Sequence, residues 1–107
     1  MPTPESKVKE MVRKVLKAYD AYWHCPVMNG LGAPSLDFVG CYYSEYFAIE
    51  TKAPGKKMTP RQLMTKGQIE ARHGRVFLID GDTRELEEWL YCVKLGWTAD
   101  HAHHPQP

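Results

Sequence analysis

Apolar and polar residues alternate with a period of two through residues 37–52, where β-branched and aromatic side chains dominate. This pattern predicts two β-strands joined by a short turn. One face of the predicted hairpin is apolar and is expected to pack into the core. The residues of that face are Phe38, Tyr42, Phe47 and Ile49.

The other face of the hairpin carries charged residues. We centre the predicted turn on Ser44-Glu45, so that Val39 faces Glu50 and Asp37 faces Lys52. Residues opposite one another on paired strands share a face, and so do next-but-one neighbours on one strand. We therefore expect Asp37, Glu50 and Lys52 to converge. A loop that differed by one residue would move Asp37 to the wrong side.

An amphipathic helix is predicted before the hairpin, from about Pro4 to Tyr22, with Thr3 as its N-cap. Glu5 lies at the N-terminal end of the inward face, from which it can reach the charged face of the hairpin, whereas Glu10 points to solvent. Stabilisation by the helix dipole is an equally good explanation of Glu5. The apolar stripe consists of Val8, Met11, Val12, Val15, Leu16 and Tyr19.

A second helix is predicted after the hairpin, and it begins near Thr59. Thr59-Pro60-Arg61-Gln62 has the pattern of a capping box, in which the Gln62 side chain accepts from the Thr59 N–H. The helix is expected to end at His73-Gly74. The apolar run 75–79 then predicts a strand, which we place in the centre of the sheet.

The remaining elements complete an α/β fold. A short strand is predicted over Trp23–Met28, and a last helix runs to about Leu95, with Leu86, Trp89, Leu90 and Val93 inward. The predicted fold is a mixed central sheet of about four strands flanked by helices. At 107 residues the chain has room for one domain, which we assign to residues 1–98. Residues 99–107 are predicted to be a disordered tail.

The total charge of +1 does not indicate a polyanionic partner, but its distribution is uneven. Basic residues gather between Lys52 and Arg75, where Glu70 is the single acid, and acidic residues prevail over residues 80–88. Three scattered cysteines without a CxxC motif indicate a reducing compartment. No secretory or membrane-spanning segment is predicted.

Two explanations of the charges at Asp37, Glu50 and Lys52 remain open from spacing alone. The first is an Asp37–Lys52 ion pair on a solvated face, which would contribute little stability. The second is a site for a hard cation such as Mg²⁺, which prefers carboxylates together with substrate phosphate.

The ordered pattern Gly-x-Pro-x-x-Asp-(x)12-Glu-x-Lys, with a glutamine ten residues later, resembles the PD-(D/E)xK nuclease superfamily, and in particular its small phage-type VRR-NUC branch. The resemblance spans about residues 5–90. Its usual Pro-Asp is replaced here by Pro34-Ser35-Leu36-Asp37. The matching residues are Gly32, Pro34, Asp37, Glu50, Lys52, Gln62 and the segments 53–56, 59–61 and 74–80.

The resemblance implies a restriction-endonuclease-like core and a set of site residues. Asp37, Glu50 and the Thr51 backbone carbonyl would hold Mg²⁺ or Mn²⁺, with Glu5 as a further ligand. Lys52 would position the attacking water. Gln62 would help to order the site. One amide cannot easily both do this and cap the second helix, and of these two roles we favour the one in the site.

The resemblance also implies DNA as the substrate, in a branched form such as a Holliday junction. Basic residues around the start of the second helix would contact its phosphates: Lys56, Lys57, Arg61 and Lys66. It further implies a homodimer without an organic cofactor, in the cytoplasm of a bacterial or phage-infected cell. Two alternatives stay open, namely a catalytically silent nucleic-acid-binding module and an interaction protein whose hairpin charges only pair.

Overall fold

The computed structural model describes residues 2–27 and 34–101. Its elements in chain order are α1 (Pro4–Ala18), β1 (Tyr22–His24), β2 (Phe38–Tyr42), β3 (Glu45–Thr51), α2 (Pro60–Glu70), β4 (Arg75–Ile79) and α3 (Arg84–His101). The four strands form one sheet in the order β1-β2-β3-β4. The first two pairings are antiparallel and the β3–β4 pairing is parallel. The predicted α/β fold, a mixed sheet of four strands flanked by helices, is confirmed.

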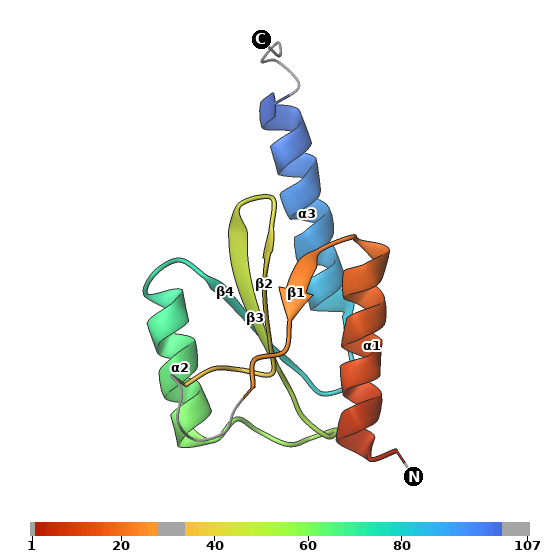
Figure 1. Ribbon diagram of the computed structural model, residues 1–107, viewed down its shortest axis with the longest axis vertical. Coiled ribbons are helices and arrows are strands. Elements are labelled where there is room, and N and C mark those ends of the chain that lie inside the picture. Colours follow the sequence, from red (N-terminus) through yellow and green to blue (C-terminus); the bar gives the residue numbers. More distant parts are fainter. Residues whose placement is uncertain (1, 28–33, 102–107) are drawn as a thin grey trace.

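Helices cover both faces of the sheet (Figure 1). α1 and α3 pack on one face around Phe38, Tyr42, Phe47 and Ile49, so the predicted core face of the hairpin is confirmed. α2 lies on the other face, over a smaller cluster. That cluster consists of Leu36, Val39, Ala48, Met58 and Val76, with Ile69 packed against it.

The β2–β3 hairpin turns at Tyr43-Ser44, one position before the predicted centre. Both residues have positive φ, 47° and 68°, which matches the twist of a two-residue hairpin turn. The pairing of Phe38 with Ile49 continues outward to place Asp37 beside Glu50. The predicted partners, Lys52 for Asp37 and Glu50 for Val39, are therefore wrong. Because the register differs by two residues, every side chain stays on its predicted face.

α1 begins as predicted, since the Thr3 hydroxyl accepts a hydrogen bond from the Ser6 N–H at 3.1 Å. The helix ends at Ala18, before the predicted end at Tyr22, and Asp20 then adopts a left-handed conformation with φ of 58°. Val8, Val12 and Leu16 form the buried row. The predicted inward position of Met11 is wrong: its side chain is 38% exposed. A helix turns by about 100° per residue, which carries Met11 away from Val12 at the centre of the row.

β4 was predicted to be central but lies at the edge of the described sheet, beside β3 only. Its apolar run has a different cause, because both of its faces pack on apolar clusters, although Leu78 is 43% exposed. Val76 packs in the cluster under α2, and Phe77 and Ile79 pack in the core under α1 and α3. Burial on two faces produces the same pattern as a central position.

The bounds of β1 and α3 also differ from the predicted ones. β1 is shorter than the predicted strand, whose last residue, Met28, lies outside the described residues, as does Gly32. α3 continues past the predicted end at Leu95 to His101 and projects beyond the sheet (Figure 1). The ring of Trp97 lies 5.7 Å from that of Tyr43, which holds this part of the helix against the hairpin. α3 includes residues 99–101, the first three of the predicted tail, and 102–107 lie outside the described residues.

Within residues 2–27 and 34–101, no helix is both long enough and apolar enough to cross a lipid bilayer.

Candidate metal centre

Three carboxylates meet at the end of the sheet where β2 begins and β3 ends. Glu5 comes from the first turn of α1, Asp37 directly precedes β2, and Glu50 belongs to β3. Each contributes one oxygen to a group in which all the oxygens lie within 4.8 Å of one another. The structure thus brings together the three acids that the sequence singled out, and we call them the acid cluster.

Asp37 is held in place by Thr51, an anchor that the sequence analysis missed. The backbone N–H of Thr51 donates to Asp37 Oδ2 at 3.0 Å, and its hydroxyl donates to the same oxygen at 2.6 Å. Thr51 is fully buried, so both donors are fixed. Since a strand residue presents its N–H and C=O to the same side, the Thr51 carbonyl is directed toward Asp37 as well.

Glu50 is a buried carboxylate, only 3% exposed. Burial raises its pKa to about 7, and the negative charge of Asp37 adds to the rise, whereas Lys52 opposes it. A carboxylate beside two others in a dry environment is costly to ionise unless a cation compensates it.

Lys52 lies with its Nζ 3.7 Å from Oε2 of Glu50. The predicted simple Asp37–Lys52 ion pair is therefore replaced by a Glu50–Lys52 pair. Both side chains are largely buried, so the ammonium group is confined beside the acid cluster. From there it can donate to a group bound between the acids.

Gln62 makes both of the contacts that the sequence presented as competing. Its Nε2 donates to Oε2 of Glu50 at 3.0 Å, and its Oε1 accepts from the Thr59 N–H at 3.0 Å. The Thr59 hydroxyl in turn accepts from the Gln62 N–H, which completes the capping box. The expectation that one amide cannot do both is wrong, because the two contacts use opposite ends of the amide.

The four residues predicted to contact DNA differ in their surroundings. Lys56, Lys57 and Arg61 are exposed on the loop before α2 and on its first turn. Asp80 anchors that loop, since its Oδ2 accepts from the Gly55 N–H at 3.2 Å. Lys66 differs from the other three because its ammonium pairs with Glu70 at 3.0 Å, four residues along the same helix. Its charge is partly neutralised there.

A second feature beside Asp37 is a pocket of about 240 Å³ between α1, the end of β1 and the start of β2. Its cationic side chains, Lys9 and Arg13, lie one and two turns after Glu5 on the same side of α1. Their sequence positions alone predicted no function for them. The i, i+4, i+8 spacing from Glu5 is the signal that could have found them.

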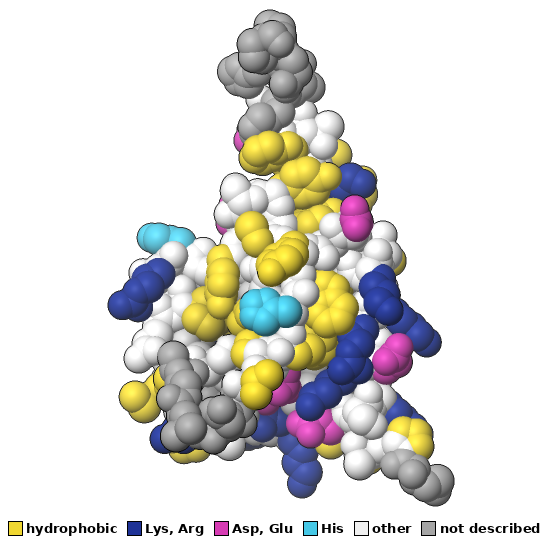
Figure 2. All heavy atoms as spheres, viewed as in Figure 1, with side chains coloured by type: hydrophobic (Ala, Val, Ile, Leu, Met, Phe, Trp, Pro, Cys, Tyr) yellow, Lys and Arg dark blue, Asp and Glu magenta, His cyan; other side chains and the backbone are white. Residues whose placement is uncertain are grey.

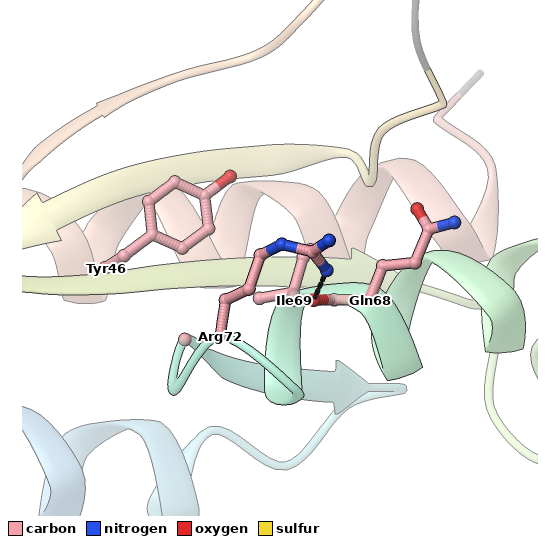
Figure 3. Close-up of a pocket in the computed structure, with 5 residues that line it drawn as sticks. Tyr46, Gln68, Ile69 and Arg72 are labelled. Carbon is pink, nitrogen blue, oxygen red and sulfur yellow. Dashed lines mark hydrogen bonds between the residues drawn. The ribbon is translucent and has the colours of Figure 1, made fainter.

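A larger hollow of about 370 Å³ lies near the C-terminal end of α2, away from Gln62. Figure 3 shows Tyr46 on one side of it and Arg72 on the other, with the Arg72 guanidinium donating to the Gln68 carbonyl at 2.9 Å. The side chains that line it within the described chain include no carboxylate. The acid cluster, which has titratable groups in contact, is the better candidate for chemistry.

The donor set of the acid cluster fits a hard divalent cation. Its members offer carboxylate oxygens, and neither histidine nor cysteine belongs to the group. Oxygen ligands of this kind suit Mg²⁺ or Mn²⁺ rather than zinc.

Comparisons of the chain with models of known protein families, with curated proteins and with solved structures found no significant match.

Proposed function

We propose that this protein is a metal-dependent DNA endonuclease that hydrolyses phosphodiester bonds. The observation that carries the proposal is that one oxygen from each of three carboxylates lies within 4.8 Å of the others, with the Lys52 ammonium 3.7 Å from the buried Glu50. Acids that only formed surface ion pairs would not need to be gathered against one another, because like charges in contact cost free energy.

In this proposal Asp37, Glu50 and the Thr51 carbonyl hold Mg²⁺ or Mn²⁺, and Glu5 completes the set directly or through water. When bound, the ion supplies a water of lowered pKa and neutralises charge on the phosphate. The two Thr51 donors keep the Asp37 carboxylate in one orientation. The Gln62 amide does the same for Glu50. The chain thereby preorganises its own ligands.

Lys52 acts on the reacting groups. Its ammonium donates to the attacking water and stabilises the negative charge that develops on the phosphate. Because it is confined beside Glu50, little reorganisation is needed when the substrate binds. Lys56, Lys57 and Arg61 contact phosphates of the same DNA without reading bases.

We further propose a branched substrate such as a Holliday junction and a homodimeric enzyme. One support is the resemblance to small phage-type nucleases. The other is the small size of the domain, which leaves little surface for contacts with DNA bases in addition to those with the DNA backbone. A two-fold dimer would present two sites to a symmetric junction.

The test is a cleavage panel of duplex, flap, splayed-arm and four-way DNA with Mg²⁺, in which wild type is compared with Lys52→Ala. We expect wild type to cut and the variant to lose about a hundredfold or more of the rate. Lys14→Ala is the matched control, because Lys14 is an exposed lysine of α1.

Two outcomes would favour the rival functions. Binding of DNA by wild type without any cutting would indicate a silent binding module. Failure of wild type to bind Mn²⁺ in a calorimetric titration would indicate that the acids have only a structural role.

A further inference from the structure

We propose that the pocket beside Asp37 binds the backbone phosphate that neighbours the cleaved one, through Lys9 and Arg13. The inference rests on the proposed function and adds a second contact region, on the opposite side of the acid cluster from α2. The pocket is about 240 Å³ in volume. Its lining residues are Lys9, Arg13, Cys25, Pro26, Asp37 and Phe38.

The spacing of residues along α1 places the two cations in one row with Glu5. Glu5, Lys9 and Arg13 follow one another at intervals of four residues, so they form a row on one side of the helix with steps of about 6 Å. All three side chains are half-buried beside the buried row Val8, Val12 and Leu16. A ligand that runs along α1 from the acid cluster therefore meets the two cations in succession.

Arg13 is already held in position before a ligand binds. Its guanidinium lies 5.8 Å from the centroid of the Phe38 ring. Its Nη1 also lies 3.4 Å from Oε2 of Glu10, a longer contact than the 3.0 Å pair of Lys66 with Glu70, and a bound phosphate would compete with that acid. A cation that is fixed before binding loses less conformational entropy when it contacts a phosphate.

The lining of the pocket favours an anion over a nucleic-acid base. Phe38 is fully buried, so its ring offers no stacking surface to a base. The remaining recognition groups are two cations beside a carboxylate, which suit an anion that also approaches a metal at the acid cluster. A DNA phosphate meets both conditions.

The position of the pocket gives a path for the DNA strand. Lys and Arg side chains gather over the α1 side of the molecule, with acidic side chains next to them (Figure 2). α1 and α2 lie on opposite sides of the sheet (Figure 1), and the acid cluster lies at the end of the sheet. A strand that contacts Lys9 and Arg13 would cross the acid cluster and leave toward Lys56 and Arg61.

The first experiment measures DNA binding in EDTA, so that no cleavage occurs, with a fluorescein-labelled four-way junction. The variant Lys9→Gln/Arg13→Gln is compared with Lys14→Gln/Lys17→Gln, which removes the same charge from exposed positions of the same helix. We expect the pocket variant to bind more weakly than the control variant. The magnitude of its slope of log affinity against log salt should be smaller than that of the control variant by about 0.9, the value for one phosphate contact.

Loss of the Arg13 contact with Phe38 could also affect folding, so a second experiment uses the wild-type chain. Cys25, Cys41 and Cys92 are free and exposed, but only Cys25 lines this pocket. Alkylation by iodoacetamide is followed by mass spectrometry with and without DNA. We expect DNA to slow the reaction of Cys25 severalfold and to leave Cys41 and Cys92 unchanged.

The outcomes separate this inference from the proposed function. If the pocket variant binds DNA as the control variant does, or if Cys25 reacts equally fast with and without DNA, the pocket assignment is overturned even where wild type cleaves. If Cys25 is protected but wild type neither cleaves DNA nor binds Mn²⁺, the nuclease proposal fails and the phosphate pocket stands.

Discussion

Gln62 joins the start of α2 to the acid cluster, because its amide donates to Glu50 Oε2 at 3.0 Å while it accepts from the Thr59 N–H. The cap of the helix and the orientation of a proposed metal ligand therefore depend on one side chain. The sequence suggested that these contacts exclude one another. The geometry shows that a single rotamer satisfies both.

Two substitutions should separate the two contacts. Gln62→Glu keeps an acceptor for the Thr59 N–H, since glutamate also forms capping boxes, but it places a carboxylate against Glu50. Thr59→Ala removes the hydroxyl that caps α2 and leaves the Gln62–Glu50 contact possible. We expect Thr59→Ala to lower the free energy of unfolding by about 1 kcal/mol with Mn²⁺ binding retained. Gln62→Glu should weaken cleavage with little loss of helix stability.

Chemical denaturation and calorimetric titration with Mn²⁺ measure these effects on the same samples. Equal losses of cleavage in both variants, in proportion to their stability, would show that Gln62 acts only through the fold of α2.

A second expectation concerns Asp37→Asn. The amide oxygen can still accept from Thr51, but the negative charge is lost. We expect Mn²⁺ binding and cleavage to be lost and the pKa of Glu50 to fall from about 7 toward its ordinary value, because the charge of Asp37 is one cause of the rise. Carboxyl chemical shifts followed through a pH titration report that pKa.

Stability distinguishes the alternatives for Asp37. A purely structural role predicts that Asp37→Asn destabilises the fold and that wild type binds no Mn²⁺. If Asp37 instead belongs to a cluster of acids that repel one another in the absence of metal, removal of its charge relieves that repulsion. The variant should then be at least as stable as wild type at neutral pH in EDTA.

The composition of the acid cluster could be predicted from the sequence although the hairpin register could not. The period of a strand assigns each residue to one of two faces, and an error of two positions preserves that assignment. Asp37 and Glu50 therefore meet as expected, but as direct neighbours. The register itself depends on the backbone of Tyr43 and Ser44, which both have positive φ. Neither tyrosine nor serine is a residue type that predicts a positive φ.

Other features of the site depend on distances between elements, which periodicity does not encode. Lys9 and Arg13 lie at the border between the buried and exposed sides of α1. A pattern that sorts residues only into apolar and polar therefore predicts that both face solvent. The Thr51 contacts to Asp37 join residues 14 positions apart in the chain. Local propensity carries no information about such contacts.

A third expectation concerns the sheet that carries the site. A Cβ at Gly40 would overlap the Tyr22 carbonyl oxygen and lie 2.6 Å from the Phe47 ring. We expect Gly40→Ala to destabilise the fold by about 3 kcal/mol, because the clash includes backbone and cannot be relieved by a side-chain movement. Urea denaturation measures the change.

Gly67→Ala is the matched control for this expectation. Gly67 lies inside α2, and nothing in the described chain lies within 4 Å of a Cβ built there. We expect this substitution to stabilise the protein by about 1 kcal/mol, since alanine loses less backbone entropy than glycine in a helix. Equal effects of the two substitutions would contradict the close packing of β1 on β2.

The last expectation is a pH dependence that changes sign when a metal is present. The pKa of Glu50 is raised from 4.5 to about 7 in the folded protein, so the folded state binds more protons than the unfolded state between these values. In EDTA, the contribution of Glu50 to stability is therefore complete below about pH 4.5 and is lost as the pH rises through 7. Metal binding requires the ionised carboxylate and displaces that proton.

The affinity for Mn²⁺ should accordingly rise by about tenfold per pH unit below 7 and level off above it, if one proton is displaced. Calorimetric titrations across this range measure the affinity, and urea denaturation in EDTA measures stability. Glu50→Gln should abolish the pH dependence of stability and, because it removes a proposed ligand, weaken Mn²⁺ binding at every pH. Glu10→Gln, which changes an exposed acid of α1, should leave stability, affinity and both pH dependences intact. An affinity that falls only below pH 4.5 would show that Glu50 is not the group displaced, because an unperturbed carboxylate is already ionised at pH 6.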